Sequence, residues 1–397
     1  MPSIDVSPLF TPLTINGTTI PNRFIMPAMQ RGWAENDGMS DQTIGYYLDR
    51  VNGGMGLLIS EGVIIDHDAG YVDIGEMHMR PDTYDGWARL GEVIKGAGGH
   101  FLLQLWHPGA VRMDGQGRYP DIAPISPSGI FNGEPRGRAI TEQDLEDLTA
   151  GWVAGAVAAQ EAGLDGVEIH MAHGYLLHQF LWHEMNRRTD GLGGDGMADR
   201  LKFPLRVLQA VRAAVKPDFI ISCRVSQWAE WDYDAKIART PEELETLIRA
   251  LDAGGADMLH MSTRYFHNPE WPDLHPTRTL SGWVKEFTDL PVVTVGSVGM
   301  NVDLMQTLYS DRDELQTIES SVAELLPLFE DGQFDLVAVG RASIGDPELV
   351  TKIRDGRFDE IRPFTRADIF DIAGDLDDHG VPEEILKLAQ QAADSGD

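Results

Sequence analysis

The sequence predicts an α/β fold built as a (β/α)8 TIM barrel. Short runs rich in Val, Ile and Leu alternate with longer helical patterns along nearly the whole 397-residue chain. This alternation is typical of a parallel sheet whose strands are joined by helices. Eight strand–helix units follow one another, which favours the barrel; a doubly wound sheet is the structural alternative.

Eight apolar runs are expected to form the strands. They cover residues 23–29, 57–60, 101–106, 166–170, 219–226, 257–262, 291–298 and 335–343. The runs are four to nine residues long, which is within the usual length of a strand. Because helical patterns separate them, the strands are expected to run parallel.

Two of the intervening helices have clear start signals. The segment 141–162 opens with Thr141, a good N-cap residue, and has Asp144 three positions further on. The segment 240–253 begins with an N-cap threonine followed by Pro241 at the first helical position. Both segments are therefore predicted to be helices.

Two insertions and a tail interrupt the regular pattern. Residues 107–140 form a Gly- and Pro-rich connection after the third strand, and this length predicts a lid or binding loop. Residues 308–320 are polar and acidic, and we expect a solvated surface element there. The chain is thus predicted to have one barrel domain at 1–363. An acidic helical tail at 364–397 would follow, with a helix near 382–393 packed outside the barrel.

Composition limits the classes of function. The chain is 42% hydrophobic with a mean hydropathy of -0.22, which suits a large core. Neither a membrane-spanning run nor a signal-peptide pattern is present, so a cytoplasmic protein is expected. The net charge of -31 disfavours nucleic acid or an anionic membrane as a partner. A phosphate-bearing cofactor would need local positive charge.

The chain has a single cysteine, Cys223. One cysteine excludes an internal disulfide and an iron–sulfur cluster held by four thiolates of this chain. A reducing compartment is the default expectation.

Polar side chains occupy the ends of two strands, where barrel enzymes carry their chemistry. The third strand ends with Gln104 and Trp106, which share one face because they are two residues apart. Packing in an interior layer is the alternative for Trp106. In the fifth strand, Ser222, Arg224 and Ser226 share one face. A buried arginine needs an anionic partner, so Arg224 marks either a ligand site or a structural salt bridge.

Each of the last two strands ends with a glycine followed by a polar residue. The seventh ends with Gly296 and Ser297, and the eighth with Gly340 and Arg341. Barrels often bind phosphate at the loops after these two strands. The arginine would supply the local positive charge that the acidic chain otherwise lacks.

The stretch GVEIHMAHGYLLHQF contains three histidines and a tyrosine at the end of the fourth strand. A metal site is one interpretation of His170 and His173, but no acidic ligand follows them and His178 falls in a helix. A buried structural pair is a second. In a third, two imidazoles bind a developing enolate oxygen and Tyr175 delivers a proton. Only the third accounts for both imidazoles and the phenol.

In five motifs the sequence resembles the Old Yellow Enzyme family of flavin-dependent ene-reductases. The motifs, within residues 6–360, are LFTPLTINGTTIPNRFIMPAM, LLQLWHPG, GVEIHMAHGYLLHQFL, NRRTDGLGG and VGRAS. The resemblance implies the same eight-stranded barrel, with FMN across the carboxyl ends of the strands and NADH or NADPH as the electron donor.

The resemblance also implies roles for individual residues. The implied cofactor-binding residues are Pro27, Ala28, Met29, Gln30, Gly62, Gln104, Arg224, Gly296, Ser297, Gly340 and Arg341. The implied substrate-binding residues are His170, His173, Trp106 and Tyr265. Tyr175 would be the proton donor, assisted by the two histidines, and no metal is implied.

The sequence departs from the family pattern at three places. Gln30 occupies the position that tunes the flavin, and Ala110 stands where many members have arginine. After the sixth strand, Tyr265, Phe266 and Trp271 make an unusually aromatic loop that is expected to reshape the pocket.

The predicted function is reduction of the C=C bond of an α,β-unsaturated carbonyl compound by NAD(P)H through FMN. The expected partner is a small enone, and assembly into a homo-oligomer is left open. A flavin-dependent amine demethylase or dehydrogenase on the same fold is the first alternative. A metal-dependent lyase or hydrolase is the second. One cysteine and this length argue against the longer relatives that add an iron–sulfur cluster.

Overall fold

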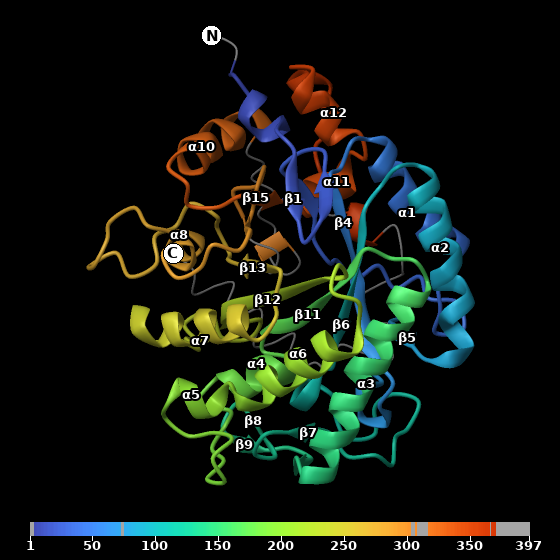
Figure 1. The fold of residues 1–397 in the computed structure, drawn as a ribbon, viewed down its shortest axis with the longest axis vertical. Helices are drawn as coiled ribbons and strands as arrows, with labels where there is room; N and C mark the ends of the chain where they lie inside the picture. The colour runs from blue at the N-terminus through green and yellow to red at the C-terminus, as the bar shows by residue number, and fades with distance from the viewer. Residues whose placement is uncertain (1–3, 73–74, 303–305, 308–316, 366, 371–397) are drawn as a thin grey trace.

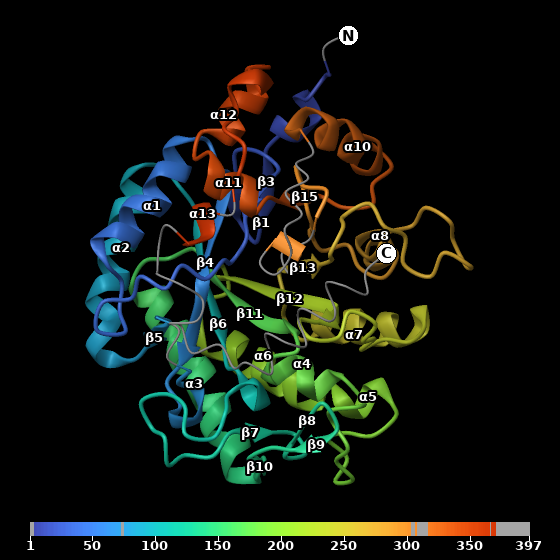
Figure 2. The ribbon, with the colours of Figure 1, turned by 180° about the vertical axis from the view of Figure 1, so that it is seen from behind.

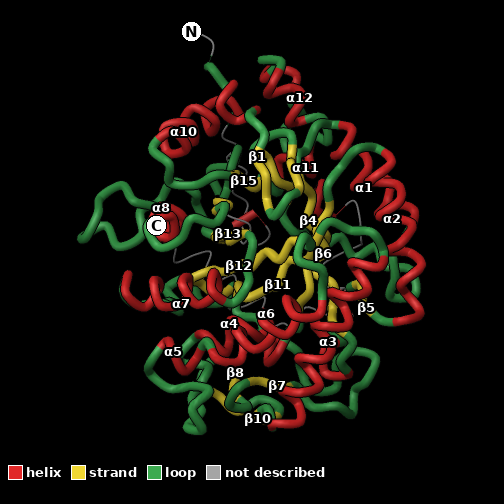
Figure 3. Tube along the Cα trace, viewed as in Figure 1, coloured by secondary structure: helices red, strands yellow, loops and turns green. Residues whose placement is uncertain are grey.

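The computed structural model describes residues 4–72, 75–302, 306–307, 317–365 and 367–370 (Figure 1). Eight parallel strands form a closed barrel, so the predicted TIM barrel is confirmed. Figure 3 shows the strands in the centre with helices around them. Within the described part of the chain, no helix is long and apolar enough to cross a membrane.

Each predicted strand is present; the strand at 101–106 has the predicted ends, and the other seven differ at one end or both. The barrel strands are β3 (Phe24–Met26), β4 (Leu57–Ile65), β6 (Phe101–Trp106), β11 (Gly166–His173), β12 (Ile220–Ala229), β13 (Met258–Ser262), β14 (Val292–Val295) and β15 (Leu336–Ala338). The barrel closes where β3 pairs with both β4 and β15. A short strand, β5 (Met77–Met79), adds to β4 outside the ring. Strand β12 runs three residues beyond its predicted end.

The barrel interior is apolar at the end where the strands begin. Residues from successive strands, among them Ile25, Leu102 and Val293, form one buried cluster. Two further members, Ile15 and Ile20, come from the antiparallel hairpin β1 (Leu13–Ile15) and β2 (Thr18–Ile20). The hairpin therefore closes this end of the barrel, and the opposite, carboxyl end remains for a site.

Helices surround the barrel between the strands. They are α1 (Asp41–Asn52), α2 (Tyr84–Gly96), α3 (Glu142–Glu161), α4 (Leu176–Leu181), α5 (Met197–Arg200), α6 (Lys202–Ala214), α7 (Pro241–Ala253), α8 (Leu280–Lys285), α10 (Ile318–Glu330), α11 (Arg341–Gly345), α12 (Leu349–Arg354) and α13 (Ala367–Phe370). Short 3₁₀ helices are η1 (Ser7–Phe10), η2 (Asp68–Gly70), η3 (Pro81–Thr83), η4 (Gly109–Val111) and η5 (Phe358–Glu360).

The predicted helix start signals are confirmed. Thr141 accepts a hydrogen bond from the backbone N–H of Asp144, whose carboxylate accepts from the backbone N–H of Thr141 in return. This reciprocal capping satisfies two donors that would otherwise lack partners in the first turn of α3. Thr240 caps α7 in the predicted way, with Pro241 following.

The connection after β6 is a folded insertion. It contains η4 and the short strands β7 (Ile125–Ser126), β8 (Ile130–Phe131), β9 (Glu134–Pro135) and β10 (Arg138–Ala139). Arg112 is buried at its centre and donates to the carbonyl oxygens of Tyr71 and Tyr119 at 2.8 and 2.7 Å. In both views these strands lie at the opposite end of the molecule from α10 and α12 (Figure 1, Figure 2).

The other insertion, predicted at 308–320, falls only partly within the described residues. Residues 308–316 lie outside the described residues, whereas Thr317 caps α10 and 318–320 form its first turn. The expected surface position holds for Glu319 and Ser320, which are exposed, but they belong to the helix. The tail helix predicted near 382–393 also lies outside the described residues.

Candidate active site

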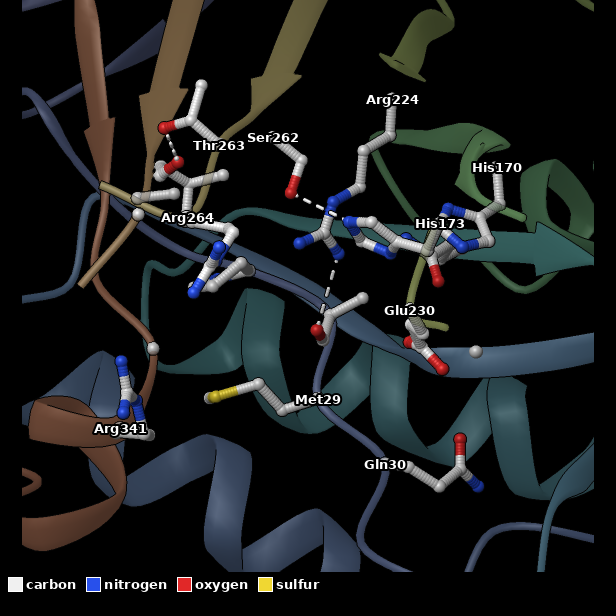
Figure 4. Close-up of a pocket in the computed structure, with 18 of the residues that line it drawn as sticks. Met29, Gln30, His170, His173, Arg224, Glu230, Ser262, Thr263, Arg264 and Arg341 are labelled. Carbon is white, nitrogen blue, oxygen red and sulfur yellow. Dashed lines mark hydrogen bonds between the residues drawn. The ribbon is translucent and has the colours of Figure 1, made fainter. Parts of the chain in front are cut away.

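A cavity of about 390 Å³ opens at the carboxyl end of the barrel (Figure 4). All eight barrel strands, or the turns that follow them, contribute to its wall. The lining residues are Pro27–Arg31, Gly62, Gln104, Trp106, His170, His173, Tyr175, Arg224, Trp228, Glu230, Tyr233, Ser262–Arg264, Val295–Val298, Ala338, Gly340, Arg341 and Ile344. The wall contains every residue predicted for the site except Tyr265.

Tyr265 requires a correction. Its hydroxyl donates to Gln306 at 3.0 Å, and its ring lines a separate surface hollow. Phe266 is buried in the core, and Trp271 packs edge-on against Trp283. The aromatic loop therefore does not form the cavity wall as predicted, because its rings have partners elsewhere.

No residue of the insertion at 107–140 lines the cavity, although all of that insertion is described. Ala110 is buried within it, and its backbone N–H donates to Gln179 at 3.1 Å. The role of this insertion as a lid stays a prediction.

His170 and His173 lie side by side on β11, with ring centroids 5.1 Å apart. His173 follows an irregularity in the pairing with β12 and has a φ of 64°, a strained value for a residue with a side chain. Its backbone N–H donates to Ser226 Oγ at 2.9 Å, and its Nε2 lies 2.7 Å from Ser262 Oγ. These contacts from two neighbouring strands hold the ring against the cavity.

Both imidazoles are neutral near pH 7. Burial, reinforced by the positive charge of Arg224, lowers the pKa of His170 and of His173 well below the usual value. His170 Nδ1 is buried and has no hydrogen-bond partner among the described residues. The pair can thus bind a polar atom without carrying charge.

A third metal ligand does not join them. His178 is buried in α4, and burial lowers its pKa to about 3. Within the described ranges, no three His, Cys, Asp or Glu side chains are grouped as metal ligands would be. The geometry gives the metal interpretation no support.

Tyr175 stands next to the histidine pair. Its ring centroid lies 5.3 Å from that of His170 and 4.7 Å from that of Trp106, which it meets edge-on. Its hydroxyl donates to Glu230 Oε2 at 3.1 Å. Trp106 lines the cavity and also packs in a small cluster with Ile64. It is therefore both a residue of the site and part of a packed layer.

Glu230 is a cavity residue that the sequence reasoning missed. Burial raises its pKa to about 7, and the hydrogen bond from Tyr175 and the charge of Arg224 offset only part of that effect. Glu230 directly follows β12, whose real end is Ala229. A glutamate directly after a barrel strand is a pattern that could have identified Glu230. The strand was predicted to end at residue 226, so Glu230 did not appear to follow it directly.

A buried polar network lies beneath the cavity around Glu168. Its carboxylate accepts from Gln104 Nε2 at 2.8 Å, from Ser222 Oγ at 3.0 Å and from His260 Nδ1 at 2.8 Å. Burial alone would raise the pKa of Glu168, but His260, Arg224 and Gln104 outweigh it and hold the pKa at about 2. The ionised carboxylate is the anionic group that compensates Arg224.

Arg224 therefore has an anionic neighbour and also faces the cavity. One of its Nη atoms lies 3.4 Å from the carbonyl oxygen of Ala28, on the segment that leads from β3 to Met29 and Gln30. Its Nε is buried without a hydrogen-bond partner among the described residues. Figure 4 shows Met29 and Gln30 on the wall opposite Arg224 and the histidines.

The far end of the cavity contains Arg341. Its guanidinium donates to Ser297 Oγ at 3.0 Å and to Thr307 Oγ1 at 2.6 Å. A Cβ on Gly296 would lie 2.6 Å from the carbonyl oxygen of Thr263, so only glycine fits there. Figure 4 places Arg341 at the opposite end of the cavity from His170.

Comparisons with known proteins agree with this geometry. Residues 8–318 match the NADH:flavin oxidoreductase / NADH oxidase family. The chain is 32% identical to an NADH oxidase of Thermoanaerobacter brockii, over 92% of this chain and 54% of that protein. It therefore spans about half the length of that relative.

Two further relatives match along most of their length. The protein named "Probable NADH-dependent flavin oxidoreductase YqiG" of Bacillus subtilis is 30% identical, over 89% of this chain and 90% of its own. A solved structure of a morphinone reductase variant in complex with tetrahydroNAD matches with a TM-score of 0.70 and 25% identity. That match covers 88% of this chain and 90% of the other.

Proposed function

The chain belongs to the NADH:flavin oxidoreductase / Old Yellow Enzyme family, and from this premise we propose that it is an FMN-dependent ene-reductase. NADH or NADPH would supply the electrons, and the substrate would be a small α,β-unsaturated carbonyl compound. One observation carries the proposal: His170, His173 and Tyr175 present two neutral imidazoles and a phenol on one cavity wall. Such a group can bind a carbonyl oxygen and deliver a proton beside it.

The residues present fit FMN. Arg224, with a buried Nε that lacks a partner in the described chain, would face the ring system, and Gln104 lies on the same wall. Arg341 and Ser297 would hold the phosphate, with Gly296 giving close approach of the backbone. The net charge of -31 would otherwise repel a phosphate, so local arginine is needed.

Each residue then has a defined task. When bound, FMN supplies hydride transfer between the nicotinamide and the substrate. His170 and His173 bind the carbonyl oxygen and stabilise the negative charge that develops on it. Ser262 fixes the ring of His173, and Tyr175 gives its phenolic proton to the α-carbon.

The proposal is tested by spectroscopy of the pure protein. We expect a flavin absorbance spectrum that bleaches on anaerobic addition of NADH or NADPH and returns when an enone is added. A colourless protein with stoichiometric zinc would favour the metal-dependent alternative. Bleaching that quinones reverse and enones do not would reject the ene-reductase.

An amine-oxidising enzyme is the second candidate. It is favoured by one observation: the carboxyl group of Glu230 lines the cavity together with the rings of Trp228 and Tyr233. Aromatic faces and a carboxylate suit a cationic amine. Bleaching of the flavin by a secondary or tertiary amine, without a nicotinamide, would support this candidate over the first.

Arg341→Ala is expected to weaken FMN binding about 10- to 150-fold. A hydrogen bond to a charged group contributes about 1.5–3 kcal/mol, and about 1.4 kcal/mol corresponds to a tenfold change in affinity. Titration of the apoprotein with FMN, followed by flavin fluorescence, measures the change. Arg354→Ala, a surface arginine paired with Asp355, is the control and should bind FMN normally. Unchanged affinity in Arg341→Ala, or FAD in the wild type, would contradict the assignment.

A further inference from the structure

Glu230 is positioned by its backbone as well as by its side chain. Its N–H donates to the carbonyl oxygen of His173 at 3.2 Å, which joins the end of β12 to the end of β11. Its carboxyl group accepts from the hydroxyl of Tyr175 at 3.1 Å. Figure 4 shows Glu230 at the same end of the cavity as His170 and His173. A carboxyl group thus touches the predicted proton donor inside the cavity.

The groups that face Glu230 differ in how they titrate. Arg224 approaches from β12 and keeps its positive charge at neutral pH, because arginine deprotonates only at very high pH. His170 and His173 approach from β11, and their pKa values lie well below the usual value, so they stay neutral. Burial raises the pKa of Glu230 to about 7. Of these groups, Glu230 is the one that gains and loses a proton near pH 7.

Two further titratable or charged groups belong to the same cavity wall. Tyr233 lines the cavity on the loop after β12, and Arg264 lies over its ring with 3.6 Å between the guanidinium carbon and the ring centroid. Glu230 itself is half-buried and borders the cavity, so its carboxyl group can exchange protons with water.

We propose that Glu230 supplies the proton that Tyr175 gives up, so that the two side chains act as one acid. This inference rests on the proposed function. The phenolic O–H bond of Tyr175 breaks as its proton goes to the α-carbon. The carboxyl O–H bond of Glu230 then breaks and returns a proton to the phenolate. A proton taken up from the solvent finally restores the carboxyl group, and no oxidation state changes in these proton transfers.

The geometry favours this role over a purely structural one. Tyr175 is the hydrogen-bond partner of the Glu230 carboxyl group within the described residues, and no ion pair with a lysine or arginine is formed there. Burial without a salt bridge makes the ionised carboxylate costly, so a stabilising structural role does not account for Glu230. Glu230 therefore acts through Tyr175 as a positioning and proton-supplying residue.

Glu230→Gln tests the proposal, because glutamine can still accept from Tyr175 but cannot give a proton. In the wild type, the rate at which an enone reoxidises the NADH-reduced protein should fall as pH rises through about 7, since Glu230 loses its proton there. The variant should lack this fall and be roughly tenfold or more slower at pH 6. Flavin reduction by NADH should be unchanged. Glu184→Gln, a surface carboxyl group, is the matched control.

A second measurement is independent of enone turnover. In the resting protein, ionisation of Tyr175 can be followed as the ultraviolet difference between each protein and its Tyr175→Phe counterpart. Because the ionised carboxylate opposes a phenolate beside it, Tyr175 should ionise at lower pH in Glu230→Gln than in the wild type. An identical titration would overturn the proposal whatever the enone rates are.

The remaining outcomes are distinct. One outcome is that enones fail to reoxidise the protein while Tyr175 still ionises at lower pH in Glu230→Gln. That result would reject the proposed function and support the coupling of Glu230 to Tyr175. A pH fall that persists in Glu230→Gln would overturn the pair even if enone reduction is real. Glu230→Asp retains an acid, so it should keep the pH fall, and it covers the case in which the glutamine variant does not fold.

Discussion

Tyr175→Phe is expected to slow reoxidation of the NADH-reduced protein by an enone about 10²–10⁴-fold, the usual contribution of a positioned general acid. Phenylalanine preserves the edge-on contact with Trp106 and removes only the hydroxyl that lies 3.1 Å from Glu230. Substrate binding through His170 and His173 should therefore survive. Flavin reduction by a nicotinamide needs no acid from the protein and should stay nearly unchanged.

Stopped-flow measurement of the two half-reactions checks this expectation. Quinone reoxidation does not protonate carbon, so it should remain fast in the variant. Tyr84→Phe, on α2 and outside the cavity wall, should leave both rates close to those of the wild type. Equal slowing of both half-reactions in Tyr175→Phe would mean that the hydroxyl maintains the site generally. An unchanged enone rate would mean that another group is the acid.

Glu168→Ala is expected to lower the free energy of unfolding by about 3–5 kcal/mol, because it leaves a buried charge without its partner. The carboxylate is fully buried and accepts three hydrogen bonds from three other barrel strands. Removing it takes away the largest favourable charge that acts on Arg224 and the acceptor of His260. Denaturant unfolding followed by circular dichroism measures the loss.

The control for that variant is Glu146→Ala, an exposed glutamate on α3, which should change stability by less than about 0.5 kcal/mol.

The stability lost in Glu168→Ala should also depend on pH. The pKa of Glu168 is lowered from 4.5 to about 2 in the folded protein, so its stabilisation is complete above pH 4.5 and is lost as pH falls toward 2. A loss below about 1 kcal/mol near pH 7 would show that Arg224 does not need this carboxylate.

Local patterns predicted the strands well and their ends poorly. An apolar run such as that of β12 reports burial of its own residues, but its end depends on pairing with neighbouring strands. His173 on β11 pairs with Ala229, which extends β12 beyond Ser226. Glu230 was missed for this reason, since it appeared to lie in a loop away from the strand end.

The aromatic loop after β13 failed for a different reason. Tyr265 was predicted to lie in the site because it closely follows a barrel strand. Its neighbour in the chain, Arg264, does line the cavity. The hydroxyl of Tyr265 instead donates to Gln306, which is 41 residues away in the chain. A local sequence pattern does not record contacts between residues that are so far apart in the chain.

The amino-acid pattern was sufficient to predict parallel strands, with a barrel favoured over a doubly wound sheet, and to place the residues after the strands along one rim. This follows because the carboxyl ends of parallel strands meet at the same edge, whatever the details of packing. Which of these side chains carry charge could be read only from their packing in three dimensions. Burial and the charge of Arg224 make His170 and His173 neutral, and burial places Glu230 near its titration midpoint at pH 7. Protonation depends on solvent exclusion and on charges from other strands, and both are set by packing.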